Sequence, residues 1–407
     1  MTPTRTIPAE EFEGRRRRAQ LAAAQEGLDA LLVWSKGGTS VDFYGDVLYL
    51  TNHHSPFPPN QDTPKWSARS YSCLVLPTEN EGTLVIDLPT YPQDQIHIDD
   101  VRSTLHIPGT VARVLEEKGL TKGKLGLVGK DAFLLAHFRA LQDVIGHSLL
   151  VEPADAILES LRSVKSEAEL TLLRHAADVG VEWMRTMMEA VAPGRTEGDV
   201  VGEGLRYFAS HGGFPYDVGI ASGPMSKHFF GRIGIPSWDF ERSLEVGDLV
   251  HIDAWGPVGN YYVDFVRSTV VGREPTGGQR EVLEAAVAII EHIISGLKPG
   301  VSIGELYDRG ASWLLDNGFA RHGANLAEAG TDFGQLFPAF GHGVGVGLEA
   351  PWIIEGEETI VRENMVLAIE VLVAKPDVGG AGYEENVIVT AEGCEVITQR
   401  CPTRWWN

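Results

Sequence analysis

Short apolar runs alternate with helical patterns in the first 160 residues of the chain. Apolar runs occupy residues 30–34, 72–76, 83–86 and 124–128, and a helical pattern precedes them. Strands of this length between helices are typical of layered sheets, so we predict an α/β domain over residues 1–160. A proline-rich loop at 52–65 is longer than a compact domain usually carries without a function, which makes it a candidate lid.

A second pattern begins near residue 161. Ser166-Glu-Ala-Glu169 has the sequence of a capping box, in which a serine and a glutamate close the start of a helix. Apolar residues follow it at helical spacing, and further helices are predicted over 197–211, 278–296 and 303–317. Glycine-bounded strands lie between them. Because 407 residues also exceed what one core usually organises, residues 161–407 are predicted to form a second, α+β domain.

Two predicted hairpins in this domain carry pairs of acidic residues. Asp253 ends an apolar strand, and Asp264 lies in the returning strand beyond a predicted turn at 256–260. The two residues are symmetric about that turn, so we expect their side chains to face each other, with Cβ atoms about 5 Å apart. Glu370 and Glu384 flank a second turn in the same way. Like charges facing each other destabilise a sheet unless a cation neutralises them, which predicts a divalent-metal site.

A glycine-rich segment supplies a candidate nitrogen ligand. His342 lies in Gly341-His-Gly-Val-Gly-Val-Gly347, where glycines let the backbone approach a site closely. Taken alone, such a histidine is more often structural, and either acidic hairpin alone is equally consistent with a solvent-facing pair. The recurrence of the pattern in two apolar hairpins favours the metal site.

In chain order these residues resemble the creatinase, prolidase and methionine aminopeptidase superfamily. The resemblance covers about residues 162–395, and residues 1–160 more loosely resemble the N-terminal domain of the creatinase and prolidase branch. It implies an α+β chain, with a C-terminal pita-bread (creatinase/aminopeptidase) catalytic domain preceded by an α/β N-terminal domain. The matching positions are His228, Asp253, Asp264, His342, Glu370 and Glu384.

The resemblance also implies how two metal ions would be held. Asp253 would chelate one ion, and Asp264 and Glu384 would bridge both. His342 and Glu370 would complete the second. This oxygen-rich set with a single imidazole suits Mn, Fe, Co or Zn. Two such ions would supply a hydroxide that attacks the carbonyl of an amide C–N bond.

His228 and Glu349 are the candidate catalytic residues. His228 matches a family histidine that would donate a proton to a leaving nitrogen or stabilise an oxyanion, although a loop histidine is often merely exposed. Glu349 stands where the peptidases have a second histidine, and Gly382 where the prolidase branch usually has an arginine. Glu349 would be a general base or hold a cationic substrate group; the alternative is that it caps a turn before Pro351.

Three functions are compatible with these residues. The first is a metallohydrolase resembling Xaa-Pro dipeptidases and aminopeptidases, acting on a dipeptide or a small amino-acid derivative. The second is a non-peptidase relative acting on a small zwitterion, like the ectoine hydrolases or dimethylsulfoniopropionate lyases. The departures at Glu349 and Gly382 favour it, and nearby aromatic residues are able to hold a cationic group. The third is a catalytically inactive domain used for binding, which the five retained ligands disfavour.

Composition limits the partners. A formal net charge of -22 excludes a nucleic-acid partner, because phosphate binding needs a basic surface. The sequence has neither an apolar run of about 18 residues nor the apolar core of a secretory signal, so we expect a cytoplasmic protein without a membrane partner. Cys73, Cys394 and Cys401 are too scattered for a disulfide framework and are expected to be free thiols. The family resemblance implies a homodimer.

Overall fold

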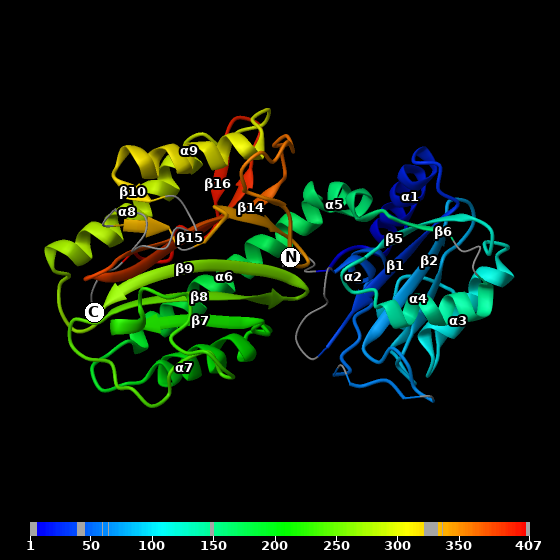
Figure 1. Cartoon of the computed structure of the whole chain (residues 1–407), viewed down its shortest axis with the longest axis horizontal. Helices are drawn as coiled ribbons and strands as arrows, with labels where there is room; N and C mark the ends of the chain where they lie inside the picture. Colours follow the sequence, from blue (N-terminus) through cyan, green and yellow to red (C-terminus); the bar gives the residue numbers. More distant parts are fainter. Residues whose placement is uncertain are drawn as a thin grey trace, which may run out of the picture. The chain divides into compact units, whose positions relative to one another are not determined.

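The computed structural model of the chain divides into two compact units, Thr6–Arg162 and Ser163–Asn407 (Figure 1). The predicted domain boundary, between residues 160 and 161, lies two residues before this division. None of the helices in the described part of the chain is long and apolar enough to span a membrane. The structure describes residues 6–38, 45–58, 60–63, 65–146, 150–320, 333–335 and 337–403.

The N-terminal unit is built on one mixed sheet of six strands, in the order β4-β3-β2-β1-β5-β6. β1 pairs in parallel with β5 and antiparallel with β2. All residues of β2 and nearly all of β1 are buried, which explains why both are continuous apolar runs in the sequence. The strands are β1 (Ala30–Lys36), β2 (Tyr71–Pro77), β3 (Thr83–Ile86), β4 (Val101–Ser103), β5 (Lys124–Val128) and β6 (Leu150–Pro153).

Helices cover this sheet, and the predicted α/β architecture is confirmed. α3 and α4 pack against each other (Figure 1). The predicted loop at 52–65, described except for residues 59 and 64, follows α2; its function as a lid stays a prediction. The helices are α1 (Ala9–Gln25), α2 (Asp46–Thr51), η1 (Gln93–Gln95), α3 (Ile107–Glu117), α4 (Leu135–Ile145) and α5 (Asp155–Ser163).

The C-terminal unit contains two sheets. Three antiparallel strands form the smaller sheet, β7-β8-β9, and the larger one has the path β10-β11-β14-β12-β13, with β15 pairing β14 and β16. The strands are β7 (Asp217–Ser222), β8 (Leu249–Val258), β9 (Tyr261–Val270), β10 (Phe319–Ala320), β11 (Phe333–Gln335), β12 (Gly341–Val344), β13 (Leu348–Trp352), β14 (Val366–Lys375), β15 (Gly379–Val389) and β16 (Cys394–Val396).

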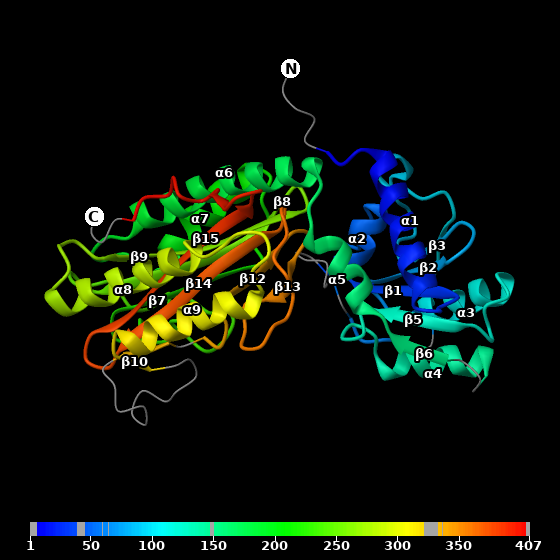
Figure 2. The same cartoon turned by 90° about the horizontal axis from the view of Figure 1, so that it is seen from above.

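Helices lie on the outside of these sheets (Figure 2). α6 and α7 pack together over the smaller sheet, while α8 packs on β14 and β15 with α9 beside it. The predicted capping box is present, because Ser166 Oγ accepts the Glu169 N–H at 3.2 Å and Glu169 accepts the Ser166 N–H at 3.0 Å. The helices are α6 (Glu167–Ala190), α7 (Glu197–Ser210), η2 (Gly223–Met225), α8 (Gly277–Ile294) and α9 (Ile303–Asp316).

The two predicted hairpins, β8–β9 and β14–β15, form the centre of this unit. β9 lies beside β15, so the two hairpins present neighbouring strands to each other. Apolar residues from α8, α9, β14 and β15 form one buried cluster, and residues from α6, α7, β8 and β9 form another. The acidic residues of both hairpins therefore lie between two hydrophobic cores.

Candidate metal centre

The second hairpin has the predicted register. Glu370 of β14 is directly opposite Glu384 of β15, and residues 376–378 connect the strands. Directly paired residues of an antiparallel ladder point to the same face. The prediction that these two carboxylates face each other is confirmed.

The first hairpin has a shorter turn than predicted, and this shifts its register. β8 continues to Val258, and the turn consists of Gly259 and Asn260, with φ values of 58° and 74°. Both central residues of a two-residue type I′ turn require positive φ, which glycine and asparagine adopt most readily. Residues 256–258, which were predicted to belong to the turn, are therefore part of the strand.

As a result, Asp253 pairs with Val266, and Asp264 pairs with Trp255. The prediction that Asp253 and Asp264 are directly opposed was wrong. They are diagonal neighbours offset by two residues, which keeps both side chains on one face and within reach of a common ion. The residue before β7 also contacts this part of β8, because the Tyr216 N–H donates to the Trp255 carbonyl at 2.9 Å.

The five predicted ligands form one buried cluster. Asp264, His342 and Glu384 offer ligand atoms within 4.8 Å of one another, and so do Asp253, Glu370 and Glu384. His342 Nε2 lies 3.4 Å from Asp264 Oδ2 and 3.9 Å from Glu370 Oε1. Glu384 belongs to both groups. Even the most exposed of the five, Glu370, is only 9% exposed, so the cluster is shielded from water.

Burial and mutual repulsion disfavour the ionised carboxylates of this cluster. Burial, followed by the charges of Asp264 and Glu370, raises the pKa of Asp253 well above its usual range. Burial and the neighbouring carboxylates act in the same way on the pKa of Glu384. Burial also raises the pKa of Glu370 to about 7, although His342 opposes it. A divalent cation would remove the repulsion that causes these shifts.

The pKa of His342 is raised, as expected for a histidine beside carboxylates. Burial lowers the pKa of His342, but the neighbouring Asp264 and Glu370 outweigh burial and raise this pKa to about 9. The imidazole thus carries a proton in the metal-free cluster at neutral pH. A metal ion would replace that proton, since the neutral imidazole is the ligand form.

The donor atoms fit a metal ion. Asp253 Oδ1 and both carboxylate oxygens of Glu384 are buried, and none has a hydrogen-bond partner among the described residues. Buried carboxylate oxygens are normally hydrogen-bonded, so these three atoms call for another partner. Four carboxylates and one imidazole match the preferences of Mn, Fe, Co or Zn.

Backbone and side-chain contacts hold the ligands in place from behind. The Asp264 N–H donates to Asn386 Oδ1 at 3.1 Å, and the Asn386 amide donates to the Asp264 carbonyl. Arg267 is 1% exposed; it donates to the Glu384 carbonyl at 2.6 Å and to Glu385 Oε1 at 2.8 Å. These contacts tie β9 to β15, the two strands that carry Asp264 and Glu384.

Glycines on both sides of His342 allow its backbone to lie close to the neighbouring strands. A Cβ on Gly341, whose φ is 127°, would collide with the Ala368 carbonyl, and one on Gly343 would lie 2.5 Å from the Ala350 carbonyl. The His342 ring donates from Nδ1 to the Gly343 carbonyl at 3.0 Å. This hydrogen bond fixes the tautomer and directs Nε2 toward the carboxylates.

His228 lies outside the cluster, on a segment that reaches it. Its side chain is exposed, and its N–H donates to the Met225 carbonyl at 2.8 Å. The next residue, Phe229, is anchored because His251 Nε2 donates to its carbonyl at 3.2 Å. A Cβ on Gly219 would lie 3.2 Å from the Phe229 ring and 3.5 Å from Asp253 Cβ, so this segment borders Asp253, one of the predicted ligands.

Glu349 forms an ion pair with Lys165, a residue that no sequence pattern had indicated. Its Oε1 lies 2.6 Å from Lys165 Nζ, and the two side chains are 8% and 1% exposed. Glu349 does not belong to the groups of possible metal ligands found among the described residues. No local pattern joins these positions, which are 184 residues apart.

Gly382 has no room for the arginine of the prolidase branch. A Cβ at this position would lie 2.5 Å from Val266 Cγ1, and the Gly382 N–H and carbonyl are both bonded to Ser268 Oγ. The close packing of β9 on β15 therefore leaves no space for a side chain at position 382.

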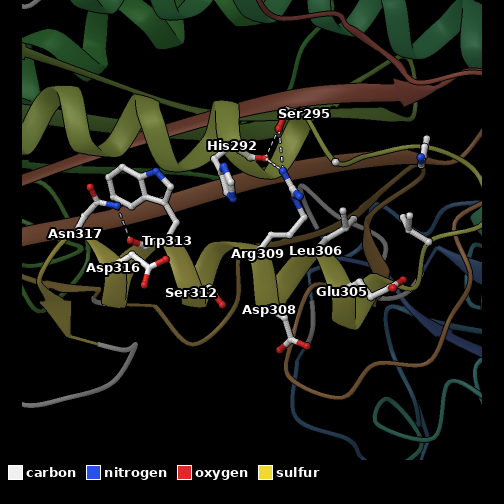
Figure 3. A pocket seen from close by; sticks show the side chains of 13 residues that line it. His292, Ser295, Glu305, Leu306, Asp308, Arg309, Ser312, Trp313, Asp316 and Asn317 are labelled. Carbon is white, nitrogen blue, oxygen red and sulfur yellow. Dashed lines mark hydrogen bonds between the residues drawn. The ribbon is translucent and has the colours of Figure 1, made fainter.

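A separate pocket of about 670 Å³ lies between α8 and α9 (Figure 3). Arg309 crosses it and donates to the His292 carbonyl at 2.8 Å and to Ser295 Oγ at 2.9 Å. Its lining includes none of the predicted ligands or catalytic residues. This pocket is therefore distinct from the candidate metal centre.

Comparisons with known proteins agree with this architecture. The model of metallopeptidase family M24 matches residues 171–391, and the model of the creatinase/prolidase N-terminal domain matches residues 15–164. The chain is 29% identical over 252 residues to the Xaa-Pro dipeptidase of Pyrococcus horikoshii, across 60% of this chain and 65% of the dipeptidase. It is 24% identical over 410 residues to the creatinase of a Bacillus species, across 97% of this chain and 92% of the creatinase.

A solved structure shows the same fold. The dipeptidase PepE of Mycobacterium ulcerans matches with a TM-score of 0.76 and 24% identity, across 98% of each chain. The predicted fold, an α+β pita-bread domain preceded by an α/β N-terminal domain, is confirmed. The predicted resemblance to the creatinase and prolidase branch is confirmed as well.

Proposed function

Because the chain belongs to metallopeptidase family M24, we propose that it is a dinuclear-metal-dependent hydrolase that cleaves an amide C–N bond, as Xaa-Pro dipeptidases and aminopeptidases do. The observation that carries this proposal is the buried cluster of four carboxylates and one imidazole. Three of its oxygens have no hydrogen-bond partner among the described residues. Such a cluster is costly without a cation and well suited to two.

We assign the five ligands to two ions that share two carboxylates. Asp253 would hold one ion, Asp264 and Glu384 would be shared, and His342 with Glu370 would hold the other. The distance of 3.9 Å between Glu370 Oε1 and His342 Nε2 supports this assignment, and Glu370 also offers a ligand atom within 4.8 Å of those of Asp253 and Glu384. When bound, two Mn, Fe, Co or Zn ions would polarise the scissile carbonyl and acidify a water molecule between them.

His228 is the proposed proton donor to the leaving nitrogen. Its side chain is exposed beside Phe229, whose ring borders Asp253 across Gly219. Burial lowers the pKa of His251 to about 4, so this anchor of the segment is a neutral hydrogen-bond donor at neutral pH. For Glu349, the ion pair with Lys165 supports a function other than proton transfer.

Metal content and substrate turnover test the proposal together. Protein purified without added metal, and then loaded with Mn²⁺, is assayed for bound ions per chain and for cleavage of Xaa-Pro dipeptides. We expect two ions per chain, and we expect Asp264→Ala to lose both the ions and the turnover. Glu281→Gln, in the exposed Lys375–Glu281 pair, is the control and should retain both. A wild-type chain that binds no divalent ion would refute the proposal.

A specific observation favours a second substrate class, a small zwitterion. Among the aromatic residues whose sequence positions lie near the predicted ligands, Tyr261, Tyr262 and Phe340 are core residues. Trp352, by contrast, is 40% exposed, and the centroid of its ring lies 4.9 Å from that of the His342 ring. Phe229, also partly exposed, stacks on Phe337, with the two ring centroids 6.2 Å apart. Aromatic faces beside an acidic site attract ammonium and sulfonium groups.

The two substrate classes give different outcomes in the same assay. Two bound ions with dipeptide turnover would establish a peptidase. Two ions without it, and with turnover of a zwitterion such as ectoine or dimethylsulfoniopropionate, would establish the second class. An inactive binding domain is the least supported function, because all five ligands are present. The expectations of a homodimer and of a cytoplasmic location stay predictions.

A further inference from the structure

We propose that Lys165 and Glu349 are a positioning pair that sets the orientation of the His342 imidazole. This inference rests on the proposed metal site, since it assigns these two residues a function toward one of its ligands. It concerns a buried ion pair outside the cluster, with a nitrogen-to-oxygen distance of 2.6 Å.

The backbone of Lys165 is fixed on both sides. Its N–H donates to the Asn364 carbonyl at 2.9 Å, and Val164 forms an antiparallel bridge with Met365 just before β14. Ser166, the next residue, is the N-cap of α6. The ammonium group therefore extends from a rigid junction between a helix and a strand, and it also donates to the Ser163 carbonyl at 3.3 Å.

The carboxylate of Glu349 packs against the glycine turn, Gly345–Gly347, which follows His342. A Cβ on Gly345 would lie 2.9 Å from Glu349 Cδ, so the carboxylate group packs directly against this glycine. Gly345 is also bound from the other side, because the Tyr262 N–H donates to its carbonyl at 2.9 Å. The turn is thus held between the Lys165–Glu349 pair and the β8–β9 hairpin.

The pairing of β12 with β13 connects Glu349 to the predicted ligand His342. Glu349 of β13 pairs with Gly343 of β12, and the register shifts between Gly343 and His342. The Gly343 carbonyl accepts the hydrogen bond from His342 Nδ1 at 3.0 Å. A movement of Glu349 would therefore move the carbonyl that orients the imidazole. Groups that orient a ligating histidine are typically worth about 10- to 100-fold in metal affinity.

This arrangement separates a positioning function from direct catalysis. A general base needs an unpaired carboxylate near the substrate, whereas the Glu349 carboxylate is 8% exposed and paired with an ammonium. If the pair acts as a unit, loss of either charge has the same effect, and loss of both adds little. If Glu349 acts by itself, loss of Lys165 has no effect and the double variant equals Glu349→Gln. If the two residues act independently of each other, their losses multiply.

The test measures the Kd for Mn²⁺ in Lys165→Met, Glu349→Gln and the double variant, all as full-length protein. We expect each single variant to raise the Kd of the ion on the His342 side at least about ten-fold. The Kd of the double variant should exceed that of either single variant by no more than about three-fold. Wild-type affinity in Lys165→Met, or multiplied losses in the double variant, would overturn the inference.

A matched control separates positioning from general destabilisation. Arg162 and Asp46 form a buried pair in the N-terminal unit, at 2.7 Å and with both side chains 7% exposed. Asp46→Asn should lower the Tm by an amount similar to Glu349→Gln but leave the Kd for Mn²⁺ unchanged. An equal loss of affinity in Asp46→Asn would refute positioning. A wild-type protein without Mn²⁺ binding would instead refute the proposed function.

Discussion

Titration of Glu370 should make the metal-free protein less stable as the pH rises. Burial raises the pKa of this carboxyl from 4.5 to about 7. A group whose pKa is raised by folding stabilises the folded state below its unfolded pKa, and this stabilisation is lost as the pH rises through the folded pKa. The window for Glu370 therefore extends from about pH 4.5 to about pH 7. His342, with a folded pKa of about 9, acts in the same direction above pH 6.5.

The magnitude follows from the difference between the two pKa values of Glu370. One pKa unit is worth about 1.4 kcal/mol, so a change from 4.5 to about 7 corresponds to a loss on the order of 3 kcal/mol. For a domain of 150–250 residues, each kcal/mol shifts the Tm by roughly 2–4 °C. We expect Glu370 alone to lower the Tm of the metal-free protein by roughly 6–12 °C between pH 5 and pH 8, and His342 to add to this fall above pH 6.5.

Bound metal should reverse this trend. The ligands must be ionised carboxylates and a neutral imidazole, so metal binding strengthens as the pH rises. Differential scanning calorimetry with chelator and with Mn²⁺ would show a Tm difference that grows from pH 5 to pH 8. Metal-free Glu370→Gln is the control, because an amide does not titrate. A metal-free Tm that stays constant or rises with pH, or an equal slope in Glu370→Gln, would refute the reasoning.

Two further predictions concern the packing behind the ligands. Arg267→Met leaves the carboxylate of Glu385 buried without its cation, so we expect urea denaturation of the metal-free protein to show a loss of about 3–5 kcal/mol; an unchanged midpoint would argue against this network. Gly382→Ala places a methyl group 2.5 Å from Val266 Cγ1, so we expect a loss of about 1–3 kcal/mol that Gly382→Ala/Val266→Ala partly recovers. A single variant as stable as wild type would show that the strands are not tightly packed there.

Local patterns predicted the elements well because their causes are local. The capping box at Ser166 and the buried strands of the N-terminal sheet depend on residues within a few positions of each other. The pairing of Glu370 with Glu384 also followed from sequence, since the connection between these strands is short and contains the residues expected of a turn. The candidate metal site could be predicted because two such hairpins each carry a pair of acidic residues.

The register of the first hairpin was not predictable in the same way. Gly256 and Pro257 are typical turn residues, yet both lie in β8. The Phe214 N–H donates to the Pro257 carbonyl at 3.0 Å, so a third segment of chain extends the sheet over them. Tertiary pairing thus outweighed the local preference for a turn, and Asp253 moved two residues away from the position opposite Asp264.

The two departures from the family pattern have different physical causes, which sequence alone did not separate. Gly382 is required by packing, because Val266 fills the space of any side chain there. Glu349 is part of a charge pair whose second member, Lys165, lies 184 residues away, just before the capping box. Introducing the arginine of the prolidases at position 382 would therefore need a smaller residue at Val266. Replacing Glu349 by histidine would leave the buried ammonium of Lys165 without its carboxylate, so each position must change together with its structural partner.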